Sequence, residues 1–165
     1  MLRALFIPAF VLAALAGAPA PSPFAPLEIY NGTWTVRAQH SFSGNPGPDT
    51  LTNHCHVGEA FYTCEQIVNG KPAALLIFTL SSEPGKFDVD SIMPNGHASS
   101  DTDLLISGPH NEHWTFVTNS APKTPSFRVE NTFSGPNAIH FEMFSTTDAG
   151  KTWTKVNEGD DTRNP

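Results

Sequence analysis

Residues 61–78 read FYTCEQIVNGKPAALLIF, two runs of strand-forming residues joined by Asn69-Gly70. Asn-Gly is typical of a two-residue type I′ turn, because both central positions of that turn take a positive φ. The stretch therefore predicts a tight antiparallel β-hairpin, with strands near 60–69 and 72–81.

The same alternation of strand-forming runs and turn residues continues along the chain. Clusters of Gly, Pro and Asn separate runs rich in Val, Ile, Thr and aromatic residues, at intervals of about 10 to 14 residues. Ten strands are predicted, near 30–43, 50–57, 60–69, 72–81, 86–93, 97–107, 112–119, 126–133, 138–146 and 151–157. With 15 prolines and 12 glycines, a helical bundle is excluded. The short loops favour a single antiparallel up-and-down β-barrel of about 8–10 strands, with a β-sandwich as the alternative. A barrel of this size can enclose one small ligand.

The hairpin between 126–133 and 138–146 also allows a prediction of its register. Matching apolar to apolar residues places Val129 opposite Phe141. The same register sets Arg128 opposite Glu142 on the other face, and such a complementary pair supports it.

The N-terminal segment has the pattern of an export signal. Residues 1–16 combine Arg3 with a short apolar run that ends in small residues, which predicts a secretory signal peptide. The run is too short to span a membrane. We expect residues 17–27 to form a Pro/Ala-rich linker, residues 28–163 to form one barrel domain, and the protein to be periplasmic or secreted.

Cys55 and Cys64 are the only cysteines in the chain. In an exported protein two cysteines most simply form one disulfide, which is the interpretation we favour. A metal site at His54-Cys55-His56 is the alternative, although alternating side chains of a strand point to opposite faces. His54 and His56 share one face and remain weak candidates for two metal ligands.

Charge and motifs narrow the classes of function. The net charge is −7 and no basic cluster occurs, which argues against a nucleic-acid partner. Serine-nucleophile, phosphate-loop and zinc-binding motifs do not occur, so we assign no catalytic residue and expect no cofactor. The sequence favours non-catalytic binding of a small ligand. A metal-dependent or acid/base enzyme on the same barrel, and a cell-envelope interaction module with a filled core, are the alternatives.

Two sets of residues resemble known proteins. Gly32-Thr33-Trp34 and Arg163 resemble the lipocalin and calycin pattern, which implies that Trp34 packs at the closed end of a barrel and that Arg163 covers it. Longer segments are similar to exported bacterial proteins with a lipocalin-like barrel, namely 31–34, 55–66, 68–71 and 145–153. This second resemblance implies the fold and implies no activity.

Aromatic residues on the predicted strands are the remaining clue to a binding site. Most should be core, but in a hollow barrel some would line an apolar cavity together with a few polar groups. The candidate lining residues are Tyr62, Gln66, Phe78, Trp114, Thr115, Phe116, His140 and Phe141. We expect the ligand to be apolar or amphipathic.

Overall fold

A computed structural model describes residues 21–121 and 124–165. The predicted signal peptide, 1–16, and the start of the predicted linker lie outside the described residues. One 3₁₀ helix, η1 (Ala25–Tyr30), precedes the strands. The strands are β1 (Gly32–Ala38), β2 (Asp49–Val57), β3 (Tyr62–Val68), β4 (Lys71–Leu80), β5 (Lys86–Ile92), β6 (Ala98–Ser107), β7 (His113–Ala121), β8 (Thr124–Phe133), β9 (Ala138–Ser145) and β10 (Thr154–Arg163). Within the described residues, no helix is long and apolar enough to cross a membrane.

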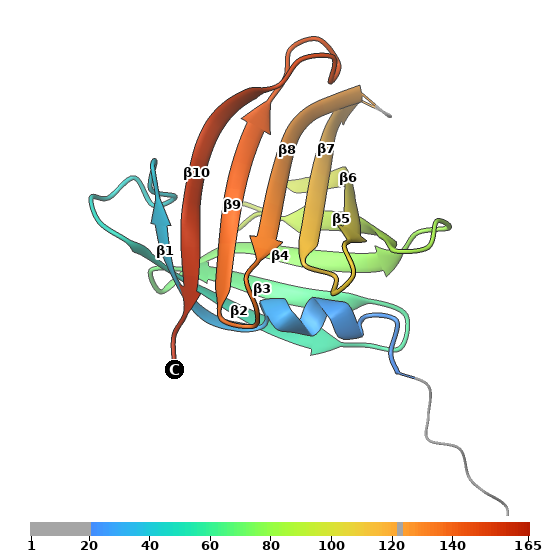
Figure 1. Cartoon of the computed structure of the whole chain (residues 1–165), viewed down its shortest axis with the longest axis horizontal. Coiled ribbons are helices and arrows are strands. Elements are labelled where there is room, and N and C mark those ends of the chain that lie inside the picture. Colours follow the sequence, from blue (N-terminus) through green and yellow to red (C-terminus); the bar gives the residue numbers. More distant parts are fainter. Residues whose placement is uncertain (1–20, 122–123) are drawn as a thin grey trace, which may run out of the picture.

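The strands form one closed antiparallel barrel, which confirms the predicted fold class (Figure 1). Each strand pairs with the next along the chain, and β1 pairs with β10 to close the sheet. Closure requires a close approach of these two strands at Gly159. A Cβ atom added there would collide with the backbone of Arg37 and Ala38, so glycine fits the seam where a larger residue would not.

The β3–β4 hairpin has the predicted turn. Asn69 and Gly70 take φ values of 50° and 76°, and Val68 pairs with Lys71 across the hairpin. The Asn-Gly pair therefore sets the register of this hairpin, as expected for a type I′ turn.

The predicted register of the β8–β9 hairpin is wrong by two residues. Val129 lies opposite Met143, and Glu130 lies opposite Glu142. The like charges of this pair are neutralised from neighbouring positions, because Arg128 contacts Glu130 at 2.9 Å and Lys155 of β10 contacts Glu142. A shift of two residues keeps every side chain on its predicted face, so the apolar pattern could not distinguish the two registers.

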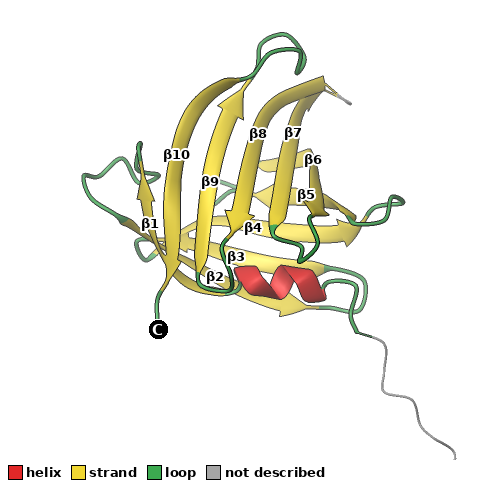
Figure 2. Cartoon of the chain, viewed as in Figure 1, coloured by secondary structure: helices red, strands yellow, loops and turns green. Residues whose placement is uncertain are grey.

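The helix η1 covers one end of the barrel (Figure 2), and buried side chains fill that end. Phe24 and Leu27 are fully buried there, and the Phe24 ring centroid lies 6.0 Å from that of Phe87. Phe24 and Leu27 belong to the expected linker, 17–27, and the structure places residues 25–27 in η1. They pack into the closed end because the barrel would otherwise expose its apolar core at that point.

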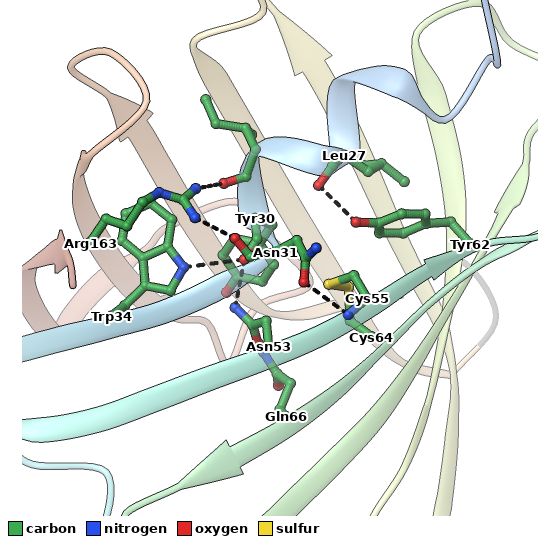
Figure 3. The surroundings of a disulfide bond; sticks show 11 residues. Leu27, Tyr30, Asn31, Trp34, Asn53, Cys55, Tyr62, Cys64, Gln66 and Arg163 are labelled. Atoms are coloured by element: carbon green, nitrogen blue, oxygen red, sulfur yellow. Dashed lines mark hydrogen bonds between the residues drawn. A yellow bond between two sulfur atoms is a disulfide. The ribbon is translucent and has the colours of Figure 1, made fainter. Parts of the chain in front are cut away.

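The predicted disulfide between Cys55 and Cys64 is present and joins paired positions of β2 and β3. Figure 3 shows its surroundings, where the side chain of Asn31 accepts a hydrogen bond of 3.1 Å from the backbone N–H of Cys55. The disulfide therefore lies beside the segment that connects η1 to β1.

Replacing both cysteines with alanine should lower the free energy of unfolding by about 2–3 kcal/mol, because a cross-link restricts the unfolded chain. Urea denaturation of the variant and of the oxidised wild type would measure the difference. Wild-type protein under reducing conditions should show a similar loss. Equal stability of all three would contradict the prediction.

Candidate functional site

The barrel encloses a cavity of about 640 Å³ above its filled end. Its mouth lies opposite η1, where the half-exposed side chains of Phe42 and Met93 belong to the lining. Sites for small molecules typically measure about 300–1,000 Å³. The cavity is therefore large enough for a small molecule and accessible from one end.

The cavity lies above a layer of bulky side chains that fills the closed end. Bulky side chains such as Trp34, Trp114 and Phe78 fill the closed end, whereas Ala74 and Val129 line the cavity. Its apolar wall consists of Leu51, Val68, Leu76, Val89, Phe116, Phe127, Val129, Phe141 and Met143. Above that layer, the inward-facing side chains of the strands leave space unfilled.

Four polar residues line the inner part of the cavity, next to the closed end. We call Tyr30, Gln66, Asn131 and Asp161 the polar floor. The Gln66 amide donates a hydrogen bond of 3.2 Å to Asn53 and also contacts the Tyr30 hydroxyl. Figure 3 shows the side chains of Tyr30, Asn53 and Gln66 in this position.

Asp161 is the charged member of the polar floor. Its exposed fraction is 7%, and its Oδ1 atom is buried without a hydrogen-bond partner among the described residues. Burial, with a smaller contribution from the charge of Asp160, raises the pKa of Asp161 to about 7. Burial and the charge of Asp161 also raise the pKa of the Tyr30 hydroxyl above its usual range. The polar floor thus holds a buried carboxyl group with an oxygen atom that is available for a hydrogen bond or an ion pair.

Asp49 fixes the loop at the mouth of the cavity. It is 3% exposed and accepts hydrogen bonds from the Phe42 backbone at 2.7 Å and from the Asn69 amide at 2.7 Å. Burial alone would raise its pKa, but the hydrogen bonds outweigh burial and lower it. Phe42 is thereby held over the mouth, with its ring centroid 5.6 Å from that of Phe141.

Three of the predicted lining residues, Gln66, Phe116 and Phe141, line the cavity. Three others, Tyr62, Phe78 and Trp114, are buried in the filled end instead. There the Tyr62 hydroxyl donates a hydrogen bond of 3.3 Å to the Leu27 carbonyl.

Thr115 and His140 were predicted to line the cavity, but neither belongs to its lining. Thr115 stands between two inward residues of β7 and therefore points outwards, because side chains alternate along a strand. His140 likewise lies on the outer face of β9, where its Nδ1 atom is 2.9 Å from Asp160.

Arg163 lies against Trp34 at the closed end. Its guanidinium carbon is 4.2 Å from the centroid of the indole ring. The guanidinium also donates hydrogen bonds to the backbone carbonyls of Ile29 and Asn31 (Figure 3). A further hydrogen bond, of 2.9 Å, runs from its Nε atom to the carbonyl of Pro136. Arg163 thereby ties the last strand to the segment between η1 and β1.

The weak metal candidates His54 and His56 are exposed on the outer face of β2. Among the described residues, the side chains suited to metal binding that come within 4.8 Å of one another are His140, Glu142 and Glu158. The Lys155 ammonium contacts both carboxylates, at 2.7 Å for Glu158, and it lowers the pKa of Glu142. This group is an ion-pair network on the barrel surface.

Tyr30, Asn131 and Asp161 were not predicted as site residues. Asp161 belongs to a strand that was expected to end at residue 157, whereas β10 continues to Arg163. Once the strand reaches that far, alternation from the buried Asn157 through Gly159 places Asp161 inside the barrel. Asp161 could therefore be recognised as an inward residue only once the end of β10 is known.

Comparisons with known proteins bear on the fold. The sequence matches no family model and no curated protein. The structure is similar to the crystal structure of Rv2717c from M. tuberculosis, with a TM-score of 0.52 and 14% identity over 88% of this chain and 99% of that one. The structure of EF1p2_mFAP2b bound to DFHBI gives a TM-score of 0.30 and 12% identity, over 87% of this chain and 100% of that one. The first likeness supports the barrel fold alone, and the second is too distant to support an argument.

Proposed function

We propose that this protein is exported and binds a small apolar or amphipathic ligand inside its barrel, without catalysis. The observation that carries the proposal is the cavity of about 640 Å³, which combines an apolar wall with a polar floor. Ligand sites typically have this composition, in which apolar contacts supply affinity and a few polar groups orient the ligand.

The position of the polar floor supports an oriented mode of binding. Asp161 and Gln66 lie at the inner end of the cavity, whereas Phe42 and Met93 lie at its mouth. A molecule with one polar end would enter with that end first and bury its apolar body along the wall. Each square ångström of apolar surface buried in this way contributes about 25 cal/mol.

The alternatives have less support. A filled-core interaction module does not require a cavity of this size, and the histidines considered for a metal-dependent enzyme, His54 and His56, are outside the barrel. Export is supported by the disulfide, since disulfides persist in oxidising compartments. The signal peptide itself remains a prediction.

Filling the cavity should abolish binding. N-phenylnaphthylamine, a neutral dye whose fluorescence rises in apolar surroundings, should bind the wild type at one saturable site. Ala74 lines the cavity, so the indole of Ala74→Trp should occupy the space and weaken dye binding at least about tenfold. Fluorescence titration would measure both affinities.

Leu75→Trp provides the matched control, because the neighbouring Leu75 does not belong to the lining. It adds the same aromatic group to the same strand and should leave dye binding within about twofold of the wild type. Circular dichroism would check that both variants fold. Failure of the wild type to bind the dye, or unchanged binding in Ala74→Trp, would overturn the proposal.

A further inference from the structure

We infer that the ligand carries a basic nitrogen, and that this cationic head lies at the polar floor against the carboxylate of Asp161. The inference rests on the proposed function, because it specifies the class of ligand for the same cavity. It comes from one feature of the floor, a buried carboxyl with an atom that has no partner among the described residues.

The surroundings of Asp161 leave its charge uncompensated. Val36 of β1 and Ile139 of β9 flank it in register and are apolar. Gln66 of β3 and Asn131 of β8, which line the same part of the cavity, are neutral amides. Tyr30 of η1 is the titratable group that faces Asp161 among the described residues of these neighbouring elements, and the nearby negative charge favours its neutral form.

The charged groups closest in sequence are engaged elsewhere. On β10 itself, Asp160 pairs with His140 on the outer face, and the Arg163 guanidinium donates to three backbone carbonyls at the closed end. Lys71 is an exposed cation of the cavity lining, but it lies at the first residue of β4, towards the mouth. None of these residues supplies Asp161 with a positive partner in the described structure.

A ligand cation would supply that partner with a small additional desolvation penalty. Desolvation is the main penalty for bringing two charges together inside a protein. For Asp161 the fold has already imposed that penalty, since its exposed fraction is 7% without any ligand. Only the ligand head must still be desolvated, whereas a carboxylate head would meet repulsion from Asp161 and a hydroxyl would gain a weaker hydrogen bond.

Three probes with one naphthyl body test the inference. Naphthylethylamine, naphthylethanol and naphthaleneacetate carry an ammonium, a hydroxyl and a carboxylate head group, respectively. Their affinities are measured by displacement of N-phenylnaphthylamine. We expect the amine to bind at least about tenfold tighter than the alcohol at about pH 8, and the acetate to bind weakest. The preference for the amine should shrink at about pH 5.5, where Asp161 must lose a proton before it can pair with a cation.

Two variants assign the preference to one carboxyl group. Asp161→Asn should make the affinities for amine and alcohol equal within about twofold. Asp160→Asn removes the same formal charge from the adjacent, outward position and should keep the preference. The wild-type comparison of amine with alcohol stands by itself should either variant fold poorly.

The possible results separate this inference from the proposed function. An amine preference that Asp161→Asn removes and Asp160→Asn keeps supports the inference. Saturable dye binding with no amine preference, or with a preference that survives Asp161→Asn, overturns the inference alone. No saturable binding of the dye overturns the proposed function and the inference with it.

Discussion

Arg163→Ala should lower the free energy of unfolding by about 3–4 kcal/mol, one of the largest effects of any single substitution in this barrel. The variant loses hydrogen bonds to the carbonyls of Ile29, Asn31 and Pro136 and the contact with the Trp34 ring. Hydrogen bonds from a charged donor contribute about 1.5–3 kcal/mol each, and partial exposure reduces that figure here. Urea denaturation measures the loss.

Two further arginine variants separate geometry from charge. Arg163→Lys keeps the positive charge but lacks the planar fork that reaches several carbonyls, so it should recover less than about half of the lost stability. Arg37 is exposed on the outer face of β1, and Arg37→Ala should change stability by no more than about 0.5 kcal/mol. Full recovery by lysine would contradict the prediction, because it would mean that charge alone matters at the closed end.

The strand pattern could be predicted from sequence because each signal is local. Turn residues at regular intervals located ten strands, and Asn69-Gly70 fixed one hairpin without reference to the rest of the chain. Short loops predict that consecutive strands pair as neighbours, which gives the up-and-down order of the strands. These features depend on a few adjacent residues.

The β8–β9 register and the end of β10 could not be predicted for the opposite reason. Glu130 faces Glu142, and the compensating charges come from Arg128 and from Lys155, which belongs to a third strand. The final part of β10 contains Gly159 and two aspartates, which are poor strand formers, yet pairing with β1 holds it in the sheet. Tertiary contacts decide both cases, and the sequence does not display them.

The candidate lining residues show which part of the site was predictable. Phe116 and Phe141 line the cavity as expected of aromatic residues on inward positions. Thr115 and His140 each stand next to one of them on the same strand, and alternation along a strand excludes both from the interior. The sequence does not show how far along the barrel axis, from the closed end to the mouth, an inward residue lies. Tyr62 and Trp114 point inwards as expected, but they lie in the filled end.

Asp161→Asn should stabilise the ligand-free barrel at about pH 8 by about 2–4 kcal/mol, and it should have little effect at about pH 4. Burial raises the pKa of this carboxyl from 3.8 to about 7. The folded wild type therefore keeps the proton between these values, whereas the unfolded chain releases it. The contribution of Asp161 to wild-type stability must fall as the pH rises from about 4 to about 7 and then level off, so the stability difference between the asparagine variant and the wild type should grow over this range.

The sign of this effect makes the experiment decisive for the binding site. A carboxylate with a good partner has a lowered pKa and stabilises a fold as the pH rises, whereas Asp161 should do the opposite. Urea denaturation of wild type, Asp161→Asn and Asp160→Asn across this pH range would measure it, and Asp160→Asn should show a much smaller change because that side chain is exposed. A difference between wild type and Asp161→Asn that does not vary with pH would mean that the carboxyl is hydrated and keeps its ordinary pKa, and the proposed cation site would lose its main support. A buried group that costs stability until a ligand arrives is what a binding site is expected to contain.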